Sequence, residues 1–362
     1  MPHPVLDAAI KYLQLEAQIG GYEAVERSQD AIERAYEAAA ALLGCRTDEI
    51  AFVENATRAW DMAFYSIPLG PGDRILTAMA EYASNYIAFL QVARKTGATV
   101  EAIPNDQHGQ ISVEALRRAI DERVKLIAIT HVPTNGGLVN PAAEVGRVAR
   151  SAGIPYLLDA CQSVGQMPIN VDEVGCDMLS ATGRKYLRGP RGTGFLYVRR
   201  GLLERLEPPF LDMHAAEWVA RDRYVVRPDA RRFENWETNY AGKIALGVAI
   251  DYALVWGLDE IERRVSTLAD KLRERLRDLP GAHVHDLGSE RCGIVTFTID
   301  RKEPEAIRLG LARHHINVSV SVANSTLLDM EARGLRSLVR ASVHYYNSEE
   351  EIELFCAALK NI

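Results

Sequence analysis

The middle of this 362-residue chain alternates short apolar runs with amphipathic stretches, and this alternation limits the possible folds most. The apolar runs are rich in branched residues, as strands buried on both faces of a parallel sheet are. They are residues 74–78, 99–103, 124–130, 154–160, 178–182 and 193–200. The stretches with helical periodicity are residues 84–97, 112–122 and 140–153. Strand–helix–strand repetition predicts a mostly parallel sheet with helices on both faces.

The pattern changes near residue 246, where a long helical stretch (244–279) leads into strands and helices of a different order. A chain of this length is too long for one simple core and suits one large and one small domain. The sequence therefore predicts a large domain over residues 16–245. Residues 1–15 and 246–362 are expected to form a smaller α+β domain.

Composition excludes several functional classes. The formal net charge is −7 and no basic tract is present, so we expect no nucleic-acid partner. No apolar run approaches the about 20 residues that span a bilayer, and no signal peptide is visible, so the expected place is the cytoplasm. The cysteines are odd in number, scattered and without a CxxC pair, so no metal site is expected. They are Cys45, Cys161, Cys176, Cys292 and Cys356.

An acid and an amine follow two consecutive predicted strands. Asp159 ends one buried strand, and Lys185 follows the next after a Thr-Gly turn. Alone, Asp159 could cap the next helix, and Lys185 could be an exposed loop residue. Their spacing, however, brings both to the same edge of the sheet, where open α/β sheets bind ligands. An amine that forms a Schiff base and a carboxylate that keeps a ring nitrogen protonated are what a pyridoxal cofactor needs.

Five motifs resemble those of the class V aminotransferase family of pyridoxal-phosphate (PLP) enzymes, in the family's order. The family includes cysteine desulfurases, selenocysteine lyases, cystine C–S lyases and isopenicillin N epimerase. The motifs are ENATRAW (54–60), AEYASN (80–85), THVPTNGGLVNP (130–141), LDACQSVG (158–165) and TGRKYLRGPRGTGFLYV (182–198). The resemblance implies the α/β fold called type I, with a mostly parallel seven-stranded sheet between helices and a smaller C-terminal α+β domain. It also implies a homodimer with active sites at the subunit interface.

The resemblance assigns cofactor roles to matching positions. Lys185 is the expected Schiff-base lysine and proton shuttle, Asp159 pairs with the pyridine nitrogen, and Gln162 binds the phenolic oxygen. Ala56 and Thr57 are expected to hold the phosphate at a helix N-terminus, where free N–H groups and the helix dipole favour an anion. The remaining cofactor residues are Tyr82 on the ring face, Thr182 and Arg184 at the phosphate, and Thr238 of RFENWETN (232–239) at the neighbouring subunit's phosphate.

Substrate-side residues follow from the same resemblance. Arg340 in RASVHYYN matches the family arginine that grips the substrate carboxylate, a task suited to a planar, bidentate guanidinium. Its alternative is a surface arginine. Thr134, His131 and His214 are further candidates near the substrate, although a lone histidine is more often a structural hydrogen-bonding group. The expected partner is a small amino-acid substrate.

Two departures from the family bear on the reaction. The ring-stacking histidine of desulfurases is Tyr82 here, and a tyrosine can stack but cannot act as a base at neutral pH. Desulfurases also carry a nucleophilic cysteine on a loop before the carboxylate-binding arginine. The corresponding segment 319–334 has Ser321, Asn324 and Ser325 but no cysteine. Cys161 is expected to point away from the cofactor if its neighbours point toward it.

The missing loop thiol disfavours desulfuration through a persulfide. What remains is chemistry that the cofactor and Lys185 perform alone. The sequence favours a C–S lyase that eliminates a thiol from an S-substituted cysteine. Alternatives are an aminotransferase, an epimerase and a PLP-binding protein without turnover, and these share one fold.

Overall fold

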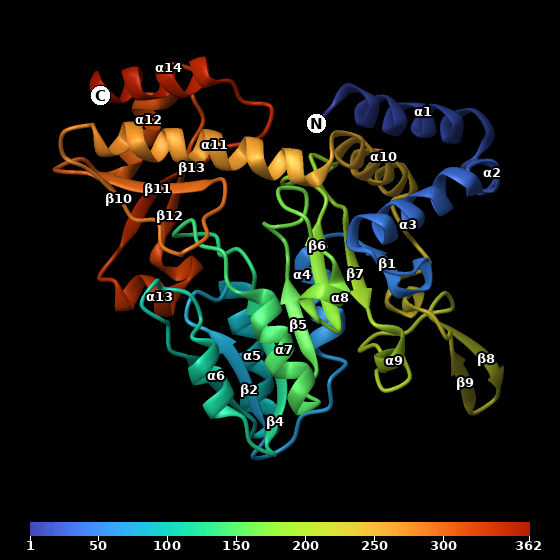
Figure 1. Ribbon diagram of the computed structural model, residues 1–362. Helices are drawn as coiled ribbons and strands as arrows, with labels where there is room; N and C mark the ends of the chain where they lie inside the picture. The colour runs from blue at the N-terminus through green and yellow to red at the C-terminus, as the bar shows by residue number, and fades with distance from the viewer.

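A large sheet of seven strands organises the protein, and Figure 1 shows it at the centre of the computed structural model, which describes all 362 residues. The strands are β1 (Ile50–Val53), β2 (Arg74–Ala78), β3 (Thr99–Ile103), β4 (Val124–Thr130), β5 (Tyr156–Asp159), β6 (Met178–Thr182) and β7 (Gly194–Val198). Their order is β1-β7-β6-β5-β4-β2-β3. All neighbours between β6 and β3 pair in parallel, and β7 is antiparallel to both β6 and β1. The prediction of a mostly parallel seven-stranded sheet is confirmed.

Six of these strands lie where the sequence predicted them. β2, β3, β4 and β6 have the predicted bounds, while β5 and β7 are slightly shorter. β1 was missed, because a four-residue run carries too little periodicity to be recognised. It extends the sheet beyond β7 by antiparallel pairing, with Ile50 opposite Tyr197.

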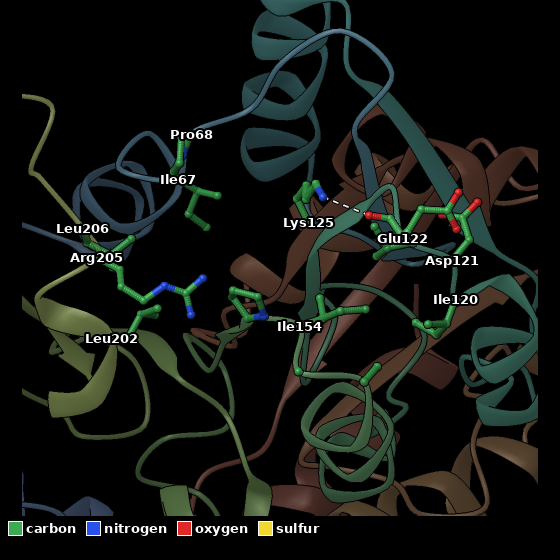
Figure 2. A pocket seen from close by; sticks show the side chains of 14 residues that line it. Ile67, Pro68, Ile120, Asp121, Glu122, Lys125, Ile154, Leu202, Arg205 and Leu206 are labelled. Carbon is green, nitrogen blue, oxygen red and sulfur yellow. Dashed lines mark hydrogen bonds between the residues drawn. The ribbon is translucent and has the colours of Figure 1, made fainter.

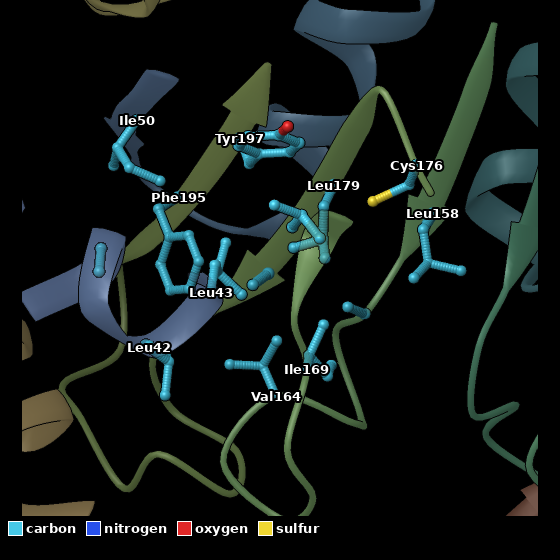
Figure 3. Close-up of a cluster of buried hydrophobic side chains, with 14 of the residues drawn as sticks. Leu42, Leu43, Ile50, Leu158, Val164, Ile169, Cys176, Leu179, Phe195 and Tyr197 are labelled. Atoms are coloured by element: carbon cyan, nitrogen blue, oxygen red, sulfur yellow. The ribbon is translucent and has the colours of Figure 1, made fainter. Parts of the chain in front are cut away.

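Helices cover both faces of this sheet. The helices up to residue 256 are α1 (His3–Ile19), α2 (Gly21–Arg27), α3 (Gln29–Leu43), α4 (Ala56–Phe64), α5 (Ala83–Thr96), α6 (Val113–Ala119), α7 (Ala142–Ala152), α8 (Val171–Val174), α9 (Arg200–Leu203) and α10 (Tyr240–Trp256), with single turns η1 (Thr47–Glu49) and η2 (Ala230–Phe233). Of these, α1 packs on α10, and α2 packs on α1 and α3. Successive strand residues serve opposite faces: Leu158 belongs to one apolar cluster and Leu157 to the other. Figure 3 shows the first cluster, where Leu42 and Leu43 of α3 lie beside Phe195 of β7. A continuous apolar strand is therefore explained by burial on both faces.

The predicted helical stretch 244–279 is two helices rather than one. α10 ends at Trp256, α11 (Leu258–Arg277) begins two residues later, and their axes differ by 79°. Gly257 between them has a φ of 83°, a left-handed conformation that a helix interior does not accept and that glycine adopts at little cost. No single helix is long and apolar enough to cross a membrane; α10 and α11 meet that test only as this bent pair.

A second, antiparallel sheet is formed by the C-terminal part. Its strands are β10 (Ala282–Val284), β11 (Ile294–Ile299), β12 (Ser319–Val322) and β13 (Ser337–Ser342), in the order β10-β11-β13-β12. Its helices are α11, α12 (Pro304–Ala312), α13 (Leu327–Ala332) and α14 (Glu349–Lys360), with the turn η3 (Ala323–Ser325). Val5 and Tyr12 of α1 share the apolar cluster of the large sheet, although residues 1–15 were assigned to the small domain. The domain boundaries remain a prediction.

A separate hairpin of β8 (Ala216–Ala220) and β9 (Arg223–Val226) projects from the large sheet (Figure 1). Its strands are almost wholly exposed, including Trp218 and Tyr224. An isolated two-stranded hairpin with exposed aromatic residues is marginally stable in water.

Candidate active site

The predicted cofactor residues meet in a cavity of about 380 Å³ beyond the carboxyl ends of β4, β5 and β6. This is the edge at which open α/β sheets bind ligands. The cavity is lined by Asn55, Ala56, Thr57, Tyr82, Asn85, Thr130, Val132, Thr134, Asp159, Cys161, Gln162, Thr182, Arg184 and Lys185. Eight residues predicted to bind the cofactor are therefore neighbours in space, together with the substrate-side candidate Thr134.

A larger cavity of about 550 Å³ lies at the opposite edge of the sheet (Figure 2). It lies at the amino ends of β4 and β5, where Val124 and Pro155 line it. Lys125 lies on its wall and donates a hydrogen bond to the backbone oxygen of Glu122 at 2.9 Å. None of the predicted site residues lines this cavity, so size alone does not locate the chemistry.

Asp159 and Lys185 reach the smaller cavity from neighbouring parallel strands. Asp159 is opposite Ser180 in the β5–β6 pairing, and Lys185 follows three residues after the end of β6. Asp159 is only 5% exposed. Burial raises the pKa of its carboxyl group, whereas hydrogen bonds and the nearby Lys185 lower it. A cationic ring nitrogen beside Asp159 would offset the cost of burying this carboxylate.

The N-terminus of α4 forms one end of the cavity. The Asn55 side chain caps this helix by accepting a hydrogen bond from the Arg58 backbone N–H at 2.9 Å. The first N–H groups of a helix have no intrahelical partner, so those of Ala56 and Thr57 are available to an anion. A Cβ on Gly194 of β7 would lie 2.7 Å from the Asn55 backbone carbon. Glycine at this position therefore permits the close approach of α4 to the sheet.

Arg340 of the C-terminal sheet does not line the cavity but contacts the lining residue Thr134. Arg340 of β13 donates from Nη1 to the Thr134 hydroxyl at 2.7 Å, and Gln162 Nε2 lies 3.5 Å from the same oxygen. Burial lowers the pKa of the Arg340 guanidinium. Thr134 thus connects the predicted carboxylate-binding arginine to the cofactor-binding loop.

The prediction that Cys161 points away from the cofactor is wrong. Cys161 lines the cavity beside Asp159 and Gln162, and its thiol lies close to Lys185. The expectation placed Cys161 on the far side because it lies between two residues that were expected to face the cofactor. The strand instead ends at Asp159 and the chain turns from Cys161, where the N–H of Ser163 donates to the Ala160 oxygen. Cys161 and Gln162 therefore both line the cavity, whereas Ala160 packs in the apolar cluster.

Three other candidates lie outside this lining. Thr238 lines an adjacent cavity of about 320 Å³ together with Lys243. His131 is 8% exposed and its Nδ1 has no hydrogen-bond partner; burial lowers its pKa to about 4. Its contact with the substrate stays a prediction. His214 lies away from the cavity, 3.5 Å from the Glu234 carboxylate.

Sequence reasoning missed Glu81, Asn85 and Thr130. Asn85 Nδ2 donates to Asp159 Oδ2 at 2.9 Å and to Glu81 Oε1 at 2.8 Å. Thr130 at the end of β4 also donates to Glu81. The four-residue spacing of Glu81 and Asn85 at the start of a helix was a usable signal for their contact.

The comparison with known families agrees with this geometry. The sequence profile described as aminotransferase class-V matches residues 1–355. The chain belongs to the class V aminotransferase family. This class V chain is 30% identical to a probable cysteine desulfurase of Methanothermobacter thermautotrophicus, covering all of this chain and 92% of the relative. It is 34% identical to a probable cysteine desulfurase of Halalkalibacterium halodurans, over 87% and 77% of the two chains.

Solved structures extend the likeness to the whole fold. The apo cysteine desulfurase of Thermococcus onnurineus superimposes with a TM-score of 0.93 at 28% identity, over 100% of this chain and 91% of that one. A cystine C–S lyase in complex with cysteine persulfide gives 0.89 at 23% identity, over 100% and 95% of the chains, a likeness of fold alone. The type I fold prediction is confirmed.

The class V family uses pyridoxal 5′-phosphate, so this chain is a PLP-dependent enzyme, as predicted. The cavity fits that cofactor. It combines an amine for the aldehyde (Lys185), a buried carboxylate for the pyridine nitrogen (Asp159) and a helix N-terminus for the phosphate. Its curated relatives are named cysteine desulfurases.

Proposed function

We propose that this enzyme is a C–S lyase that acts on S-substituted cysteines. The observation that carries the proposal is the segment 319–334, which replaces the loop that holds the desulfurase nucleophile. It forms β12, η3 and α13 and contains no cysteine. Asn135 fastens it by donating to the fully buried Thr326 hydroxyl at 2.9 Å. A docked segment without a thiol supports elimination rather than sulfur relay.

Four side chains at or beside the cavity have roles in this proposal. PLP, when bound, supplies an electron sink for the pair left by the α-proton. The Lys185 amine binds the cofactor, then takes the α-proton from the substrate and later returns a proton to its carbon atoms. Asp159 holds the ring nitrogen protonated, and Arg340 binds the α-carboxylate through its fork of donors. Thr134, hydrogen-bonded to Arg340, orients that fork.

The proposed overall reaction breaks the Cβ–S bond. The sulfur leaves with the bond's electron pair and takes a proton, which gives a free thiol. The remaining three-carbon unit takes up one water and yields pyruvate and ammonium. No external oxidant, reductant or keto acid is needed.

Cys161 supports a second candidate, cysteine desulfuration with this thiol as the sulfur acceptor. It lines the cavity, and the curated relatives are named cysteine desulfurases. Its thiolate would attack the substrate sulfur, carry it as a persulfide and leave alanine. Burial, however, raises the pKa of the Cys161 thiol, although nearby Lys185 opposes this. A thiol that stays protonated is a weak nucleophile, which favours the lyase.

Product analysis separates the two candidates. The purified holoenzyme is incubated with cystine, an S-alkyl cysteine and cysteine, and pyruvate and alanine are quantified. The lyase predicts pyruvate, with the same rate in Cys161→Ala as in the control Cys292→Ala. Alanine as the main product, lost in Cys161→Ala only, overturns the lyase. Accumulation of pyridoxamine phosphate would indicate transamination instead, and racemised substrate would indicate an epimerase.

We also propose that the enzyme is a homodimer with its sites at the subunit interface. Thr238 lines the neighbouring cavity and not the active-site cavity of its own chain. This position is expected of a residue that contacts the cofactor phosphate of the other subunit. The hairpin β8–β9 exposes Trp218 and Tyr224, and such apolar surface favours burial against a partner. Sedimentation equilibrium tests the dimer. A monomer that retains full activity at nanomolar concentration contradicts it.

A further inference from the structure

A second buried carboxylate lies behind the cofactor-binding one. Glu81 is 3% exposed and Asp159 is 5% exposed, and neither forms a salt bridge. Asn85, 2% exposed, lies between them. Its Nδ2 donates to Glu81 Oε1 at 2.8 Å and to Asp159 Oδ2 at 2.9 Å. A single amide therefore connects two carboxylates, of which only Asp159 lines the cavity.

Glu81 is held by five donors and no cation. Oε1 accepts from Asn85, from the Tyr82 N–H at 3.0 Å and from the Thr130 hydroxyl. Oε2 accepts from the Thr130 N–H at 2.9 Å and from the Thr77 hydroxyl at 3.0 Å. The two N–H groups and the amide can only donate, so this environment suits two acceptor oxygens. Burial raises the pKa of Glu81 to about 7, and these hydrogen bonds oppose the shift.

The orientation of the Asn85 amide follows from these contacts. An amide nitrogen has two hydrogens, and here each has a carboxylate acceptor. The reversed amide would direct its oxygen at two carboxylates, which repel it. Glu81 thus accepts one of the two amide hydrogens, and this contact keeps the other hydrogen directed at Asp159. The other oxygen of Asp159 accepts from the Cys161 N–H at 2.9 Å.

We propose that Glu81 is a positioning residue for the cofactor: it holds the Asn85 amide, and this amide fixes the Asp159 carboxylate that binds the pyridine nitrogen. The structure assigns this role through two hydrogen bonds in series, without contact between Glu81 and the cavity. An Asp159 fixed on both oxygens presents its remaining lone pairs in one direction. This pre-organisation favours the protonated pyridine ring over the neutral one.

The test reads the ring nitrogen directly and needs no substrate. Apoenzyme is reconstituted with PLP carrying nitrogen-15 in the ring, whose NMR shift distinguishes a protonated from a neutral pyridine. Asp159→Asn marks the signal of a lost carboxylate. In Glu81→Gln an amide N–H₂ replaces one of the two acceptor oxygens. This N–H₂ then faces at least one N–H group that can only donate, so that hydrogen bond is lost. The hydrogen-bond series is thereby broken with little change in volume.

We expect Glu81→Gln and Asn85→Ala to move the ring signal toward that of Asp159→Asn. Each is expected to weaken PLP binding about tenfold, as the loss of one charge-assisted hydrogen bond does. Asn135→Ala is the matched control, since it removes another buried amide, which contacts Thr326 rather than Asp159. It should leave the ring signal unchanged.

If Glu81→Gln does not fold, Thr130→Val carries the test, because it removes one donor to Glu81 and keeps the backbone N–H. Wild-type ring signal and PLP affinity in the folded Glu81 or Thr130 variant would overturn the proposal, as would an effect of Asn85→Ala alone. Failure of the wild-type protein to bind PLP would instead remove the proposed function, so the two failures are distinguishable.

Discussion

His344 is expected to make the fold sensitive to acid. Its ring stacks between Tyr186, at 4.8 Å between centroids, and Tyr346, at 4.6 Å, and neither ring nitrogen has a hydrogen-bond partner. Burial, aided by the positive charge of Arg188, lowers the pKa of His344 from 6.5 to about 4. The folded state therefore favours the neutral ring. Its contribution to stability is complete above pH 6.5 and is lost as the pH falls toward 4.

The magnitude follows from the two pKa values. At pH 5 an unfolded histidine is mostly protonated, while His344 in the fold is mostly neutral. The difference lowers the free energy of unfolding at pH 5 by about 2 kcal/mol relative to pH 8. His131, whose pKa is also lowered to about 4, adds a similar amount. His344→Phe keeps a stacked aromatic ring and should remove about half of this combined loss.

Urea unfolding of the apoenzyme at pH 8, 7, 6 and 5 measures the effect. The unfolding free energy of His344→Phe should fall less between pH 8 and 5 than that of the wild type, by about 2 kcal/mol. His314→Gln, at an exposed position, is the control and should follow the wild type. A pH dependence of His344→Phe equal to that of the wild type would refute the reasoning.

Four further outcomes test the site. Lys185→Ala should abolish the visible absorbance of covalently bound cofactor, and a persisting band contradicts the assignment. Asp159→Asn should lower kcat about 100-fold, as removal of one electrostatic stabiliser does, with PLP content checked by absorbance. Arg340→Leu should raise KM about 100-fold through loss of the ion pair with the substrate carboxylate, with a smaller effect on kcat. A fall in kcat as large as the rise in KM argues against a role of Arg340 in substrate binding. Gly194→Ala adds a Cβ 2.7 Å from the Asn55 backbone and the Ala181 oxygen. It should lower the unfolding free energy by about 1–3 kcal/mol in thermal or urea unfolding, whereas Gly201→Ala, with open space, should not.

Local patterns predicted most of the large sheet. Four strands have the predicted bounds because strands buried on both faces are continuous apolar runs, and such runs are visible in sequence. β1 was missed because its pairing with β7 joins residues about 145 positions apart, and four residues show no period. The break at Gly257 was also missed, since an isolated glycine within a helical pattern is often tolerated.

The site divides in the same way. Asp159 and Lys185 were found because parallel neighbouring strands end at one edge, so sequence order alone brings them together. Glu81 and Asn85 were not found, because their role depends on hydrogen bonds to Asp159 and to each other that only the folded chain forms. Cys161 was placed on the wrong side because the turn that brings both Cys161 and Gln162 to the cavity cannot be read from the motif alone.

The sequence by itself determined the alternating α/β architecture, the motifs and the two charged groups at the sheet edge. These features follow from chain-local periodicity and from the rule that parallel strands end together. Only the tertiary structure decided that Arg340 meets Gln162 through Thr134, that a thiol lines the cavity, and that Glu81 lies behind Asp159. Such contacts depend on the close packing of separate elements, where ångström-scale differences decide which hydrogen bonds form and which side chains are buried.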